Sequence, residues 1–199
     1  MINDMDYHID AWYNIVNGLG ASLSRDRVKS ECYGKNNELI ERIFPGRFSE
    51  DEKFSMSMQK EQAYQEGFRP QLRLLPGLDR LLEKAHASGI KMAIGSAAIR
   101  FNVDFVLDGL GIRHYFDAIV SAEDVVKSKP DPETFTRCAT LLGADAASCL
   151  VFEDVPKGVE SAAAAGMDTM VMLGIHKADE FAHFSNVVSL ANDYELMAW

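Results

Sequence analysis

Four polar residues in the second half of the chain have the side chains that a phosphate and cation site needs. Ser96, Lys129 and the pair Glu153-Asp154 each stand at or soon after the end of a short apolar run. Two adjacent carboxylates repel each other unless they share a cation such as Mg²⁺. A hydroxyl and an ammonium beside that cation would donate hydrogen bonds to phosphate oxygens. The residue types therefore predict a Mg²⁺-dependent phosphate site.

Each of these residues taken alone has an ordinary structural explanation. A serine after a strand commonly sits in a turn, a single lysine is usually a solvated surface charge, and a Glu-Asp pair can stabilise a helix N-terminus. Their common position after successive apolar runs favours the site over these explanations, because ligands bind at the carboxyl ends of parallel strands.

The second half of the chain alternates between candidate strands and candidate helices. The strands are expected at 91–95, 118–121, 149–153, 169–173 and, more weakly, 187–190. Helices are expected at 78–87, 99–110, 134–142 and 158–165. Strands that are apolar on both faces and are linked by helices indicate a parallel sheet covered on both sides. The predicted fold class is α/β, with a Rossmann-like parallel sheet flanked by helices and a helical cap domain.

The first part of the chain has the pattern of helices alone. Trp12, Val16 and Leu19 recur at helical spacing, and Ser49 with Glu52 predicts a capping box at the start of another helix. We expect residues 1–14 to be a linker into the cap, 15–72 to be the helical cap domain, and 73–199 to be the α/β core domain.

Three segments of the second half match motifs of a known superfamily. They are Ile94-Gly95-Ser96, the stretch SKPDPETF at 128–135, and the stretch VFEDVPKGVESAAAAGM at 151–167. In this order they resemble motifs two, three and four of the haloacid dehalogenase superfamily. Upstream, Tyr7-His8, Gly34-Lys35 and Lys60 with Tyr64 are similar to the cap of the β-phosphoglucomutase-like subgroup.

The resemblance implies a role for each matched residue. Ser96 would hold the transferring phosphoryl group, with Ala97 beside it contacting the substrate. Lys129 would neutralise the nucleophile and the phosphoryl oxygens, and Mg²⁺ would be bound by Glu153 and Asp154. The cap residues that would contact the substrate are His8, Lys35 and Lys60.

The superfamily's first motif, an apolar strand ending in Asp-x-Asp-Gly, does not occur in the 199 residues. Its first aspartate is the nucleophile that forms an aspartyl phosphate. Asp4 and Asp6 have the right spacing, but only three residues precede them and Tyr7-His8 follows them. By the resemblance, both lie after the motif. We therefore expect that the sequence begins at an internal methionine and lacks the first core strand.

Composition excludes several other classes of protein. A net charge of −10 without a basic cluster argues against nucleic-acid and anionic-membrane partners. The three cysteines are far apart and odd in number, which is typical of reduced thiols. No signal peptide is recognisable. We expect a cytoplasmic monomer that binds a small phosphorylated metabolite.

Two functions from different classes are consistent with these observations. The first is Mg²⁺-dependent phosphoryl transfer on a small phosphate ester, by a phosphatase or a β-phosphoglucomutase-like enzyme. The alternative is a non-catalytic remnant that binds phosphate or a partner, because the nucleophile is absent. A dinucleotide-binding protein is excluded, since Gly109-Leu110-Gly111 has no third glycine at the required spacing and follows a helix.

Overall fold

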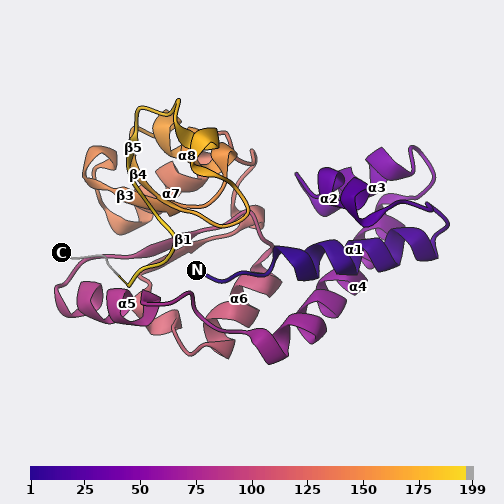
Figure 1. Cartoon of the computed structure of the whole chain (residues 1–199), viewed down its shortest axis with the longest axis horizontal. Helices are drawn as coiled ribbons and strands as arrows, with labels where there is room; N and C mark the ends of the chain where they lie inside the picture. Colours follow the sequence, from indigo (N-terminus) through magenta and orange to yellow (C-terminus); the bar gives the residue numbers. More distant parts are fainter. Residues whose placement is uncertain (196–199) are drawn as a thin grey trace. The chain divides into compact units, whose positions relative to one another are not determined.

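The computed structural model describes residues 1–195, which form two compact units (Figure 1). Residues 3–72 form one unit, called the cap unit below. Residues 1–2 together with the chain from Arg73 onward form the other, called the core unit. Each unit is described by itself.

The cap unit is entirely helical among the secondary-structure elements described. Its elements are α1 (Met5–Gly18), α2 (Arg25–Glu31), α3 (Asn36–Ile43), α4 (Glu50–Phe68) and a 3₁₀ helix (Arg69–Gln71). Residues 5–14, expected to be a linker, are instead the larger part of α1. The helix begins early because Ile9 and Trp12, on the same face as Val16, are buried, and a helical face is what removes them from water.

The N-terminus of α4 forms as the sequence predicts. The Ser49 hydroxyl accepts a hydrogen bond from the Glu52 amide at 3.3 Å, and the Glu52 carboxylate accepts one from the Ser49 amide at 2.8 Å. This reciprocal pair satisfies amides that have no partner within the helix. The predicted capping box is therefore confirmed.

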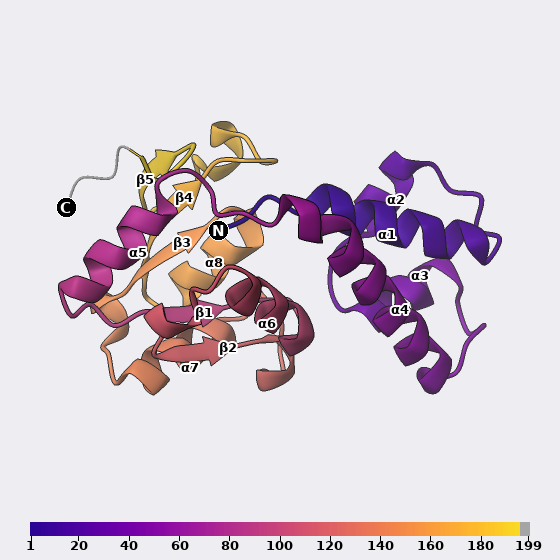
Figure 2. The same ribbon diagram turned by 90° about the horizontal axis from the view of Figure 1, so that it is seen from below.

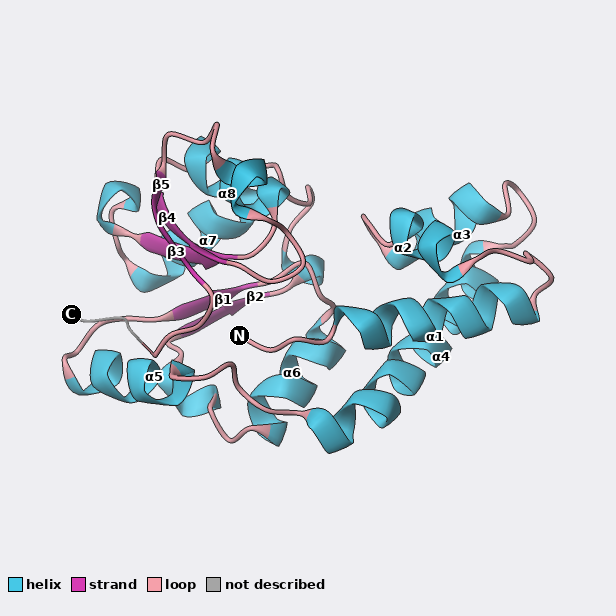
Figure 3. Ribbon diagram, viewed as in Figure 1, coloured by secondary structure: helices cyan, strands magenta, loops and turns pink. Residues whose placement is uncertain are grey.

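The core unit alternates strands and helices, as Figure 3 shows by colour. Its helices are α5 (Leu78–Ala87), α6 (Arg100–Gly109), α7 (Glu133–Leu142) and α8 (Pro156–Ala164), and its strands are β1 (Ala93–Gly95), β2 (Ala118–Val120), β3 (Leu150–Glu153), β4 (Asp168–Met172) and β5 (Val187–Ala191). All strand pairs are parallel. The predicted α/β class with helices flanking parallel strands is confirmed.

The strands are hydrogen-bonded in two groups, β1-β2 and β3-β4-β5 (Figure 2). Ile94 of β1 and Phe152 of β3 pack against the same apolar cluster, which is built on Leu78 of α5 and Leu107 of α6. Within residues 1–195, the strand paired with β1 is β2 and the strand paired with β3 is β4. The two groups therefore share a hydrophobic core although no ladder hydrogen bond joins β1 to β3.

β1 is shorter than the expected run 91–95 and begins at Ala93. The Met92 amide donates to the Asp117 side chain at 3.0 Å, and the Asp117 amide donates to the Met92 carbonyl at 2.8 Å. Because the Asp117 carboxylate takes the place of a ladder partner for the Met92 amide, regular strand pairing starts at Ala93.

Two further observations on the described residues concern the cysteines and the lengths of the apolar helices. Cys32, Cys138 and Cys149 are free thiols. No helix within residues 1–195 is long and apolar enough to cross a membrane.

Candidate functional site

Lys129 connects the carboxyl ends of β1 and β3. Its ammonium donates to the Gly95 carbonyl at 3.2 Å and forms an ion pair with the Glu153 carboxylate. It also lies 4.4 Å from the centroid of the Phe135 ring. The side chains of Lys129 and Glu153 are only 11% and 7% exposed. A partly buried ammonium is thus fixed where the two strands end, and this is where ligands bind in parallel α/β folds.

Glu153 is held by its own backbone neighbours as well as by Lys129. One of its carboxylate oxygens accepts from the amides of Asp154 at 3.0 Å and Val155 at 3.4 Å. Gly158, near the start of α8, makes this position possible, because a Cβ there would overlap the Glu153 carboxylate. The position of Glu153 therefore requires a glycine at this place in the predicted motif.

Ser96 continues the line of β1 beyond its last ladder residue. Its amide donates to the Val120 carbonyl at 2.9 Å, and its hydroxyl accepts from the Ala98 amide at 3.0 Å. Ala97 between them is exposed. Since Gly95 precedes Ser96 directly and bonds to Lys129, the structure brings Ser96, Lys129 and Glu153 to one rim of the core unit.

Asp154 is the more accessible of the two adjacent carboxylates. Its side chain is open to solvent, whereas Glu153 is buried. Desolvation by surrounding protein atoms and, after it, the negative charge of Glu153 raise the pKa of Asp154. An accessible carboxylate next to a second carboxylate is the kind of group that a divalent cation stabilises.

The donor set suits Mg²⁺ better than a cation that needs an all-protein site. Within residues 1–195 no group of three or more His, Cys, Asp or Glu side chains could enclose a metal ion. Mg²⁺ commonly keeps several waters and binds through one or two carboxylates together with substrate phosphate oxygens. Asp154, with Glu153 next to it, fits that requirement.

A second cluster of polar side chains lies in the interior of the cap unit. The Tyr64 hydroxyl donates to Asp4 at 2.6 Å, and Nε2 of His8 lies 3.5 Å from the same carboxylate. The His8 ring stacks on the Tyr64 ring with centroids 3.7 Å apart. Burial favours a higher pKa for Asp4, but the contacts with His8 and Tyr64 outweigh it and lower that pKa.

Lys60 joins His8 to the rest of this cluster. Its ammonium lies 2.7 Å from Nδ1 of His8 and 2.9 Å from the Glu61 carboxylate, which also accepts from the Asn36 side chain at 2.6 Å. Burial lowers the pKa of Lys60, and Glu61 opposes that shift. We call the residues Asp4, His8, Lys60, Glu61 and Tyr64 the cap cluster.

The three predicted cap residues do not all lie together. His8 and Lys60, far apart in the chain, are in direct contact. Lys35 is exposed at the N-terminal boundary of α3; its amide donates to the Glu38 carboxylate at 2.9 Å, and its carbonyl accepts from the Glu38 amide at 3.0 Å.

Asp4 and Glu61 belong to this cluster although no sequence motif marks them as site residues. The spacing of Asp4 and Asp6 suggests a nucleophile, which the resemblance rejects, and Glu61 matches no motif. A usable signal existed for both, because Asp4 precedes His8 by one helical turn and Glu61 directly follows Lys60.

Comparisons with known proteins agree with this architecture. The family model described as haloacid dehalogenase-like hydrolase matches residues 1–172. A β-phosphoglucomutase of Bacillus subtilis is 33% identical over 171 residues, covering 81% of this chain and 74% of the relative.

One further sequence and one solved structure extend the comparison. The fructose-1-phosphate phosphatase YqaB of Escherichia coli is 44% identical over 79 residues, covering 40% of this chain and 42% of the relative. A crystal structure of a HAD hydrolase of family IA, variant 3, from Entamoeba histolytica superimposes with a TM-score of 0.87 at 23% identity. That match covers 98% of this chain and 89% of the other, and it shows likeness of fold.

Proposed function

Because the chain belongs to the haloacid dehalogenase-like hydrolase family, we propose that it takes part in Mg²⁺-dependent phosphoryl transfer from a small sugar phosphate. The observation that carries the proposal is the position of the Lys129 ammonium, which contacts the last residue of β1 and the last residue of β3. The names of the phosphatase and the mutase among the relatives agree with a phosphorylated sugar as the substrate class.

In this proposal, Lys129 and Ser96 bind the phosphoryl group. The ammonium offsets negative charge on the phosphoryl oxygens, and the hydroxyl with the exposed Ala97 position helps to orient the group. Glu153 acts through Lys129, because its carboxylate fixes where the ammonium stands.

Asp154, with Glu153 beside it, would hold the Mg²⁺ ion. When bound, the ion supplies positive charge to the phosphate oxygens of the substrate. His8, Lys35 and Lys60 would contact the part of the substrate other than the reacting phosphate.

The nucleophile in this proposal is the aspartate that the family resemblance places at the end of a further strand, in a motif that the 199 residues do not contain. Such a strand would lie between β1 and β3, whose pairing within residues 1–195 is to β2 and β4 respectively. Its carboxyl end would then reach Lys129, which already contacts both strand ends. The aspartate oxygen would bond to phosphorus as the bond from phosphorus to the ester oxygen breaks, and that oxygen would leave as an alcohol with a proton from the second aspartate of the same motif. The oxygen of an acceptor hydroxyl would then bond to phosphorus and displace the first aspartate as a carboxylate, while the second aspartate takes the acceptor's proton.

The test combines the mass of the endogenous protein with its activity. A mass above 22.1 kDa by roughly a dozen residues or more, the length of one strand and its loop, together with Mg²⁺-dependent release of phosphate, would support the proposal. A mass of 22.1 kDa with phosphate binding but no turnover would overturn the enzymatic part and favour a non-catalytic phosphate-binding protein. We further propose that the protein is a cytoplasmic monomer. Sedimentation velocity of the purified protein tests the monomeric state, and fractionation of the source cells tests the location.

A further inference from the structure

The loop that carries Lys129 has no apolar anchor of its own. Val125 before it and Phe135 after it are buried, whereas every residue from 126 to 133 is half-buried or exposed. Val126 is an apolar residue that is 82% exposed. Burial of side chains therefore does not fix the main chain here, although the Lys129 ammonium needs a fixed main chain to stand at the ends of β1 and β3.

Glu133 supplies the contacts that hold the first part of this loop. It is the first residue of α7, and its carboxylate accepts hydrogen bonds from the Val126 amide at 3.0 Å and from the Lys127 amide at 2.8 Å. These two amides lower the pKa of Glu133, so the side chain is a carboxylate at neutral pH and acts as an acceptor only. One side chain thus ties two consecutive amides of the loop to the start of a helix.

Asp131 holds the part of the loop that follows Lys129. Its amide donates to the Ser128 carbonyl at 3.2 Å, and its carbonyl accepts from the Ser161 hydroxyl of α8 at 2.7 Å. The Asp131 carboxylate also accepts from the amide of Glu133 at 3.0 Å. Lys129 therefore lies between two anchored points, of which the first depends on Glu133 and the second on α8.

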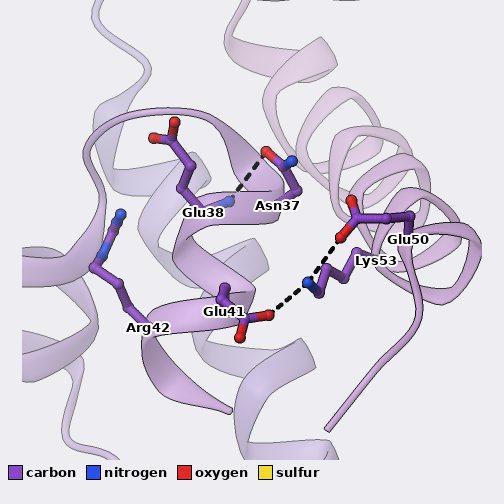
Figure 4. A pocket seen from close by; sticks show the side chains of 6 residues that line it. All are labelled: Asn37, Glu38, Glu41, Arg42, Glu50 and Lys53. Carbon is purple, nitrogen blue, oxygen red and sulfur yellow. Dashed lines mark hydrogen bonds and ion pairs between the residues drawn. The ribbon is translucent and has the colours of Figure 1, made fainter. Parts of the chain in front are cut away.

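Glutamates in a pocket of the cap unit have partners of a different kind. In this pocket of about 490 Å³, Glu41 and Glu50 contact the Lys53 ammonium at 2.5 Å and 2.9 Å (Figure 4). These ion pairs join side chains of helices whose main chains are already held by their own hydrogen bonds. Glu133 instead joins its side chain to loop amides, so losing this carboxylate would release main chain and not only a side chain.

From these contacts we infer that Glu133 is a positioning residue for Lys129. Its carboxylate keeps the loop in the conformation in which the ammonium reaches the Gly95 carbonyl and the Glu153 carboxylate. Glu133 acts through the main chain of residues 126–129 and does not itself touch the phosphate. The consequence for binding rests on the proposed function, because a displaced ammonium would contact the phosphoryl oxygens less well.

Chemical labelling of Lys129 tests the positioning without requiring phosphate or turnover. Acetic anhydride reacts with accessible amines, and mass spectrometry of the digested full chain compares the labelling rate at Lys129 with the rate at the exposed Lys177. We expect Glu133→Ala to make Lys129 react severalfold faster, because the loop opens more often when its two amides lose their acceptor. An unchanged rate in a variant that circular dichroism shows to be folded would overturn the inference.

Three further variants separate the hydrogen bonds of Glu133 from its charge. Glu133→Gln keeps an oxygen that accepts from an amide and should restore part of the slow labelling. Val126→Ala keeps the donating amide, and Asp79→Ala removes an exposed carboxylate in the first turn of α5. Both controls should label like the parent. Faster labelling in Asp79→Ala to the same extent as in Glu133→Ala, or a glutamine variant as fast as the alanine variant, would contradict the hydrogen-bonding role.

Calorimetric titration with inorganic phosphate in the presence of Mg²⁺ connects the position of Lys129 to the proposed function. Glu133→Ala should raise the dissociation constant for phosphate about tenfold, and the two controls should leave it unchanged. Parent-like affinity in a Glu133→Ala variant whose Lys129 labels faster would overturn the role in phosphate binding. If the parent itself binds no phosphate, the proposed function fails, whereas faster labelling in Glu133→Ala would still support the positioning of the ammonium.

Discussion

Lys129 in the core unit and Lys60 in the cap unit each have a largely inaccessible side chain and each pair with a glutamate. Lys129 in the core unit pairs with Glu153, which is 24 residues away in the chain, and also bonds to a strand carbonyl. Lys60 in the cap unit pairs with Glu61, the next residue of its own helix, and with His8. Both ammonium groups also lie near aromatic rings, Phe135 for Lys129 and Trp12 for Lys60.

The difference lies in what surrounds the two pairs. Lys129 stands at strand ends next to the solvent-accessible Asp154, where a ligand and a cation can approach. Lys60 is 3% exposed and belongs to a run of hydrogen bonds from Tyr64 to Asn36. The same pair of residue types therefore serves phosphate binding in the proposed function at one place and joins α1 to α4 at the other.

The largest expected effect separates the two lysines directly. Lys129→Met should abolish Mg²⁺-dependent binding of inorganic phosphate, because the ammonium that would contact the phosphoryl oxygens is gone. Lys60→Met is the matched change in the other unit. It should change the dissociation constant for phosphate by less than about threefold, which corresponds to less than about 1 kcal/mol of binding free energy. Titration calorimetry on both variants provides the measurement. Equal losses in the two variants would remove the distinction between the units.

Both substitutions should also lower stability, since each leaves a buried carboxylate without its cation. Breaking a buried ion pair costs about 3–5 kcal/mol. Urea unfolding followed by circular dichroism measures the change. It also shows whether a loss of phosphate binding reflects unfolding, because a folded Lys129→Met variant that binds phosphate normally would contradict the assigned role.

A smaller effect tests whether Glu153 needs its exact position. Gly158→Ala places a methyl group where the Glu153 carboxylate lies. We expect a loss of about 1–3 kcal/mol in the free energy of unfolding, the usual range for overpacking, together with weaker phosphate binding. Gly174→Ala is the control in the same unit, since a Cβ there meets nothing within 4 Å. A Gly158→Ala variant that behaves like the control would show that Glu153 can move without consequence.

The two units also differ in how much of each could be predicted from the sequence. The rim of the core unit was predictable because strand ends in a parallel sheet meet at one edge, so the order of Ser96, Lys129 and Glu153 along the chain was sufficient. The cap cluster was predictable only in part. The resemblance marks His8 and Lys60, but their contact depends on how α1 packs on α4, and helix periodicity indicates a buried face without its partner. The same limit explains the mistaken linker at 1–14, where α1 begins at Met5.

The pH dependence of stability tests the charge state of the cap cluster. The pKa of Asp4 is lowered from 3.8 in the folded protein, so the unfolded chain binds the proton more readily. Its contribution is fully present above about pH 3.8 and is lost as the pH falls through the lower folded value.

Asp4→Asn should therefore cost about 1–2 kcal/mol at pH 7, the usual value of hydrogen bonds to a charged group, and less at pH 3. Comparing urea unfolding of the variant and the parent at both pH values isolates Asp4 from the other carboxylates, which titrate in both proteins. A difference that grows on acidification would mean that Asp4 is not held as a carboxylate by His8 and Tyr64.

The smallest expected effect concerns α4, the helix that carries Lys60. Ser49→Ala removes the hydroxyl that accepts from the Glu52 amide and should lower stability by about 1 kcal/mol, as for other helix N-caps. Ser55→Ala, an exposed change inside the same helix, should be neutral or slightly stabilising, because alanine is the better helix former. Phosphate binding at the Lys129 rim should be unchanged in both variants, since neither residue belongs to the core unit. Loss of that binding in Ser49→Ala alone would show that the stability of the cap helix controls the core site, and the separation of roles between the two lysines would then no longer hold.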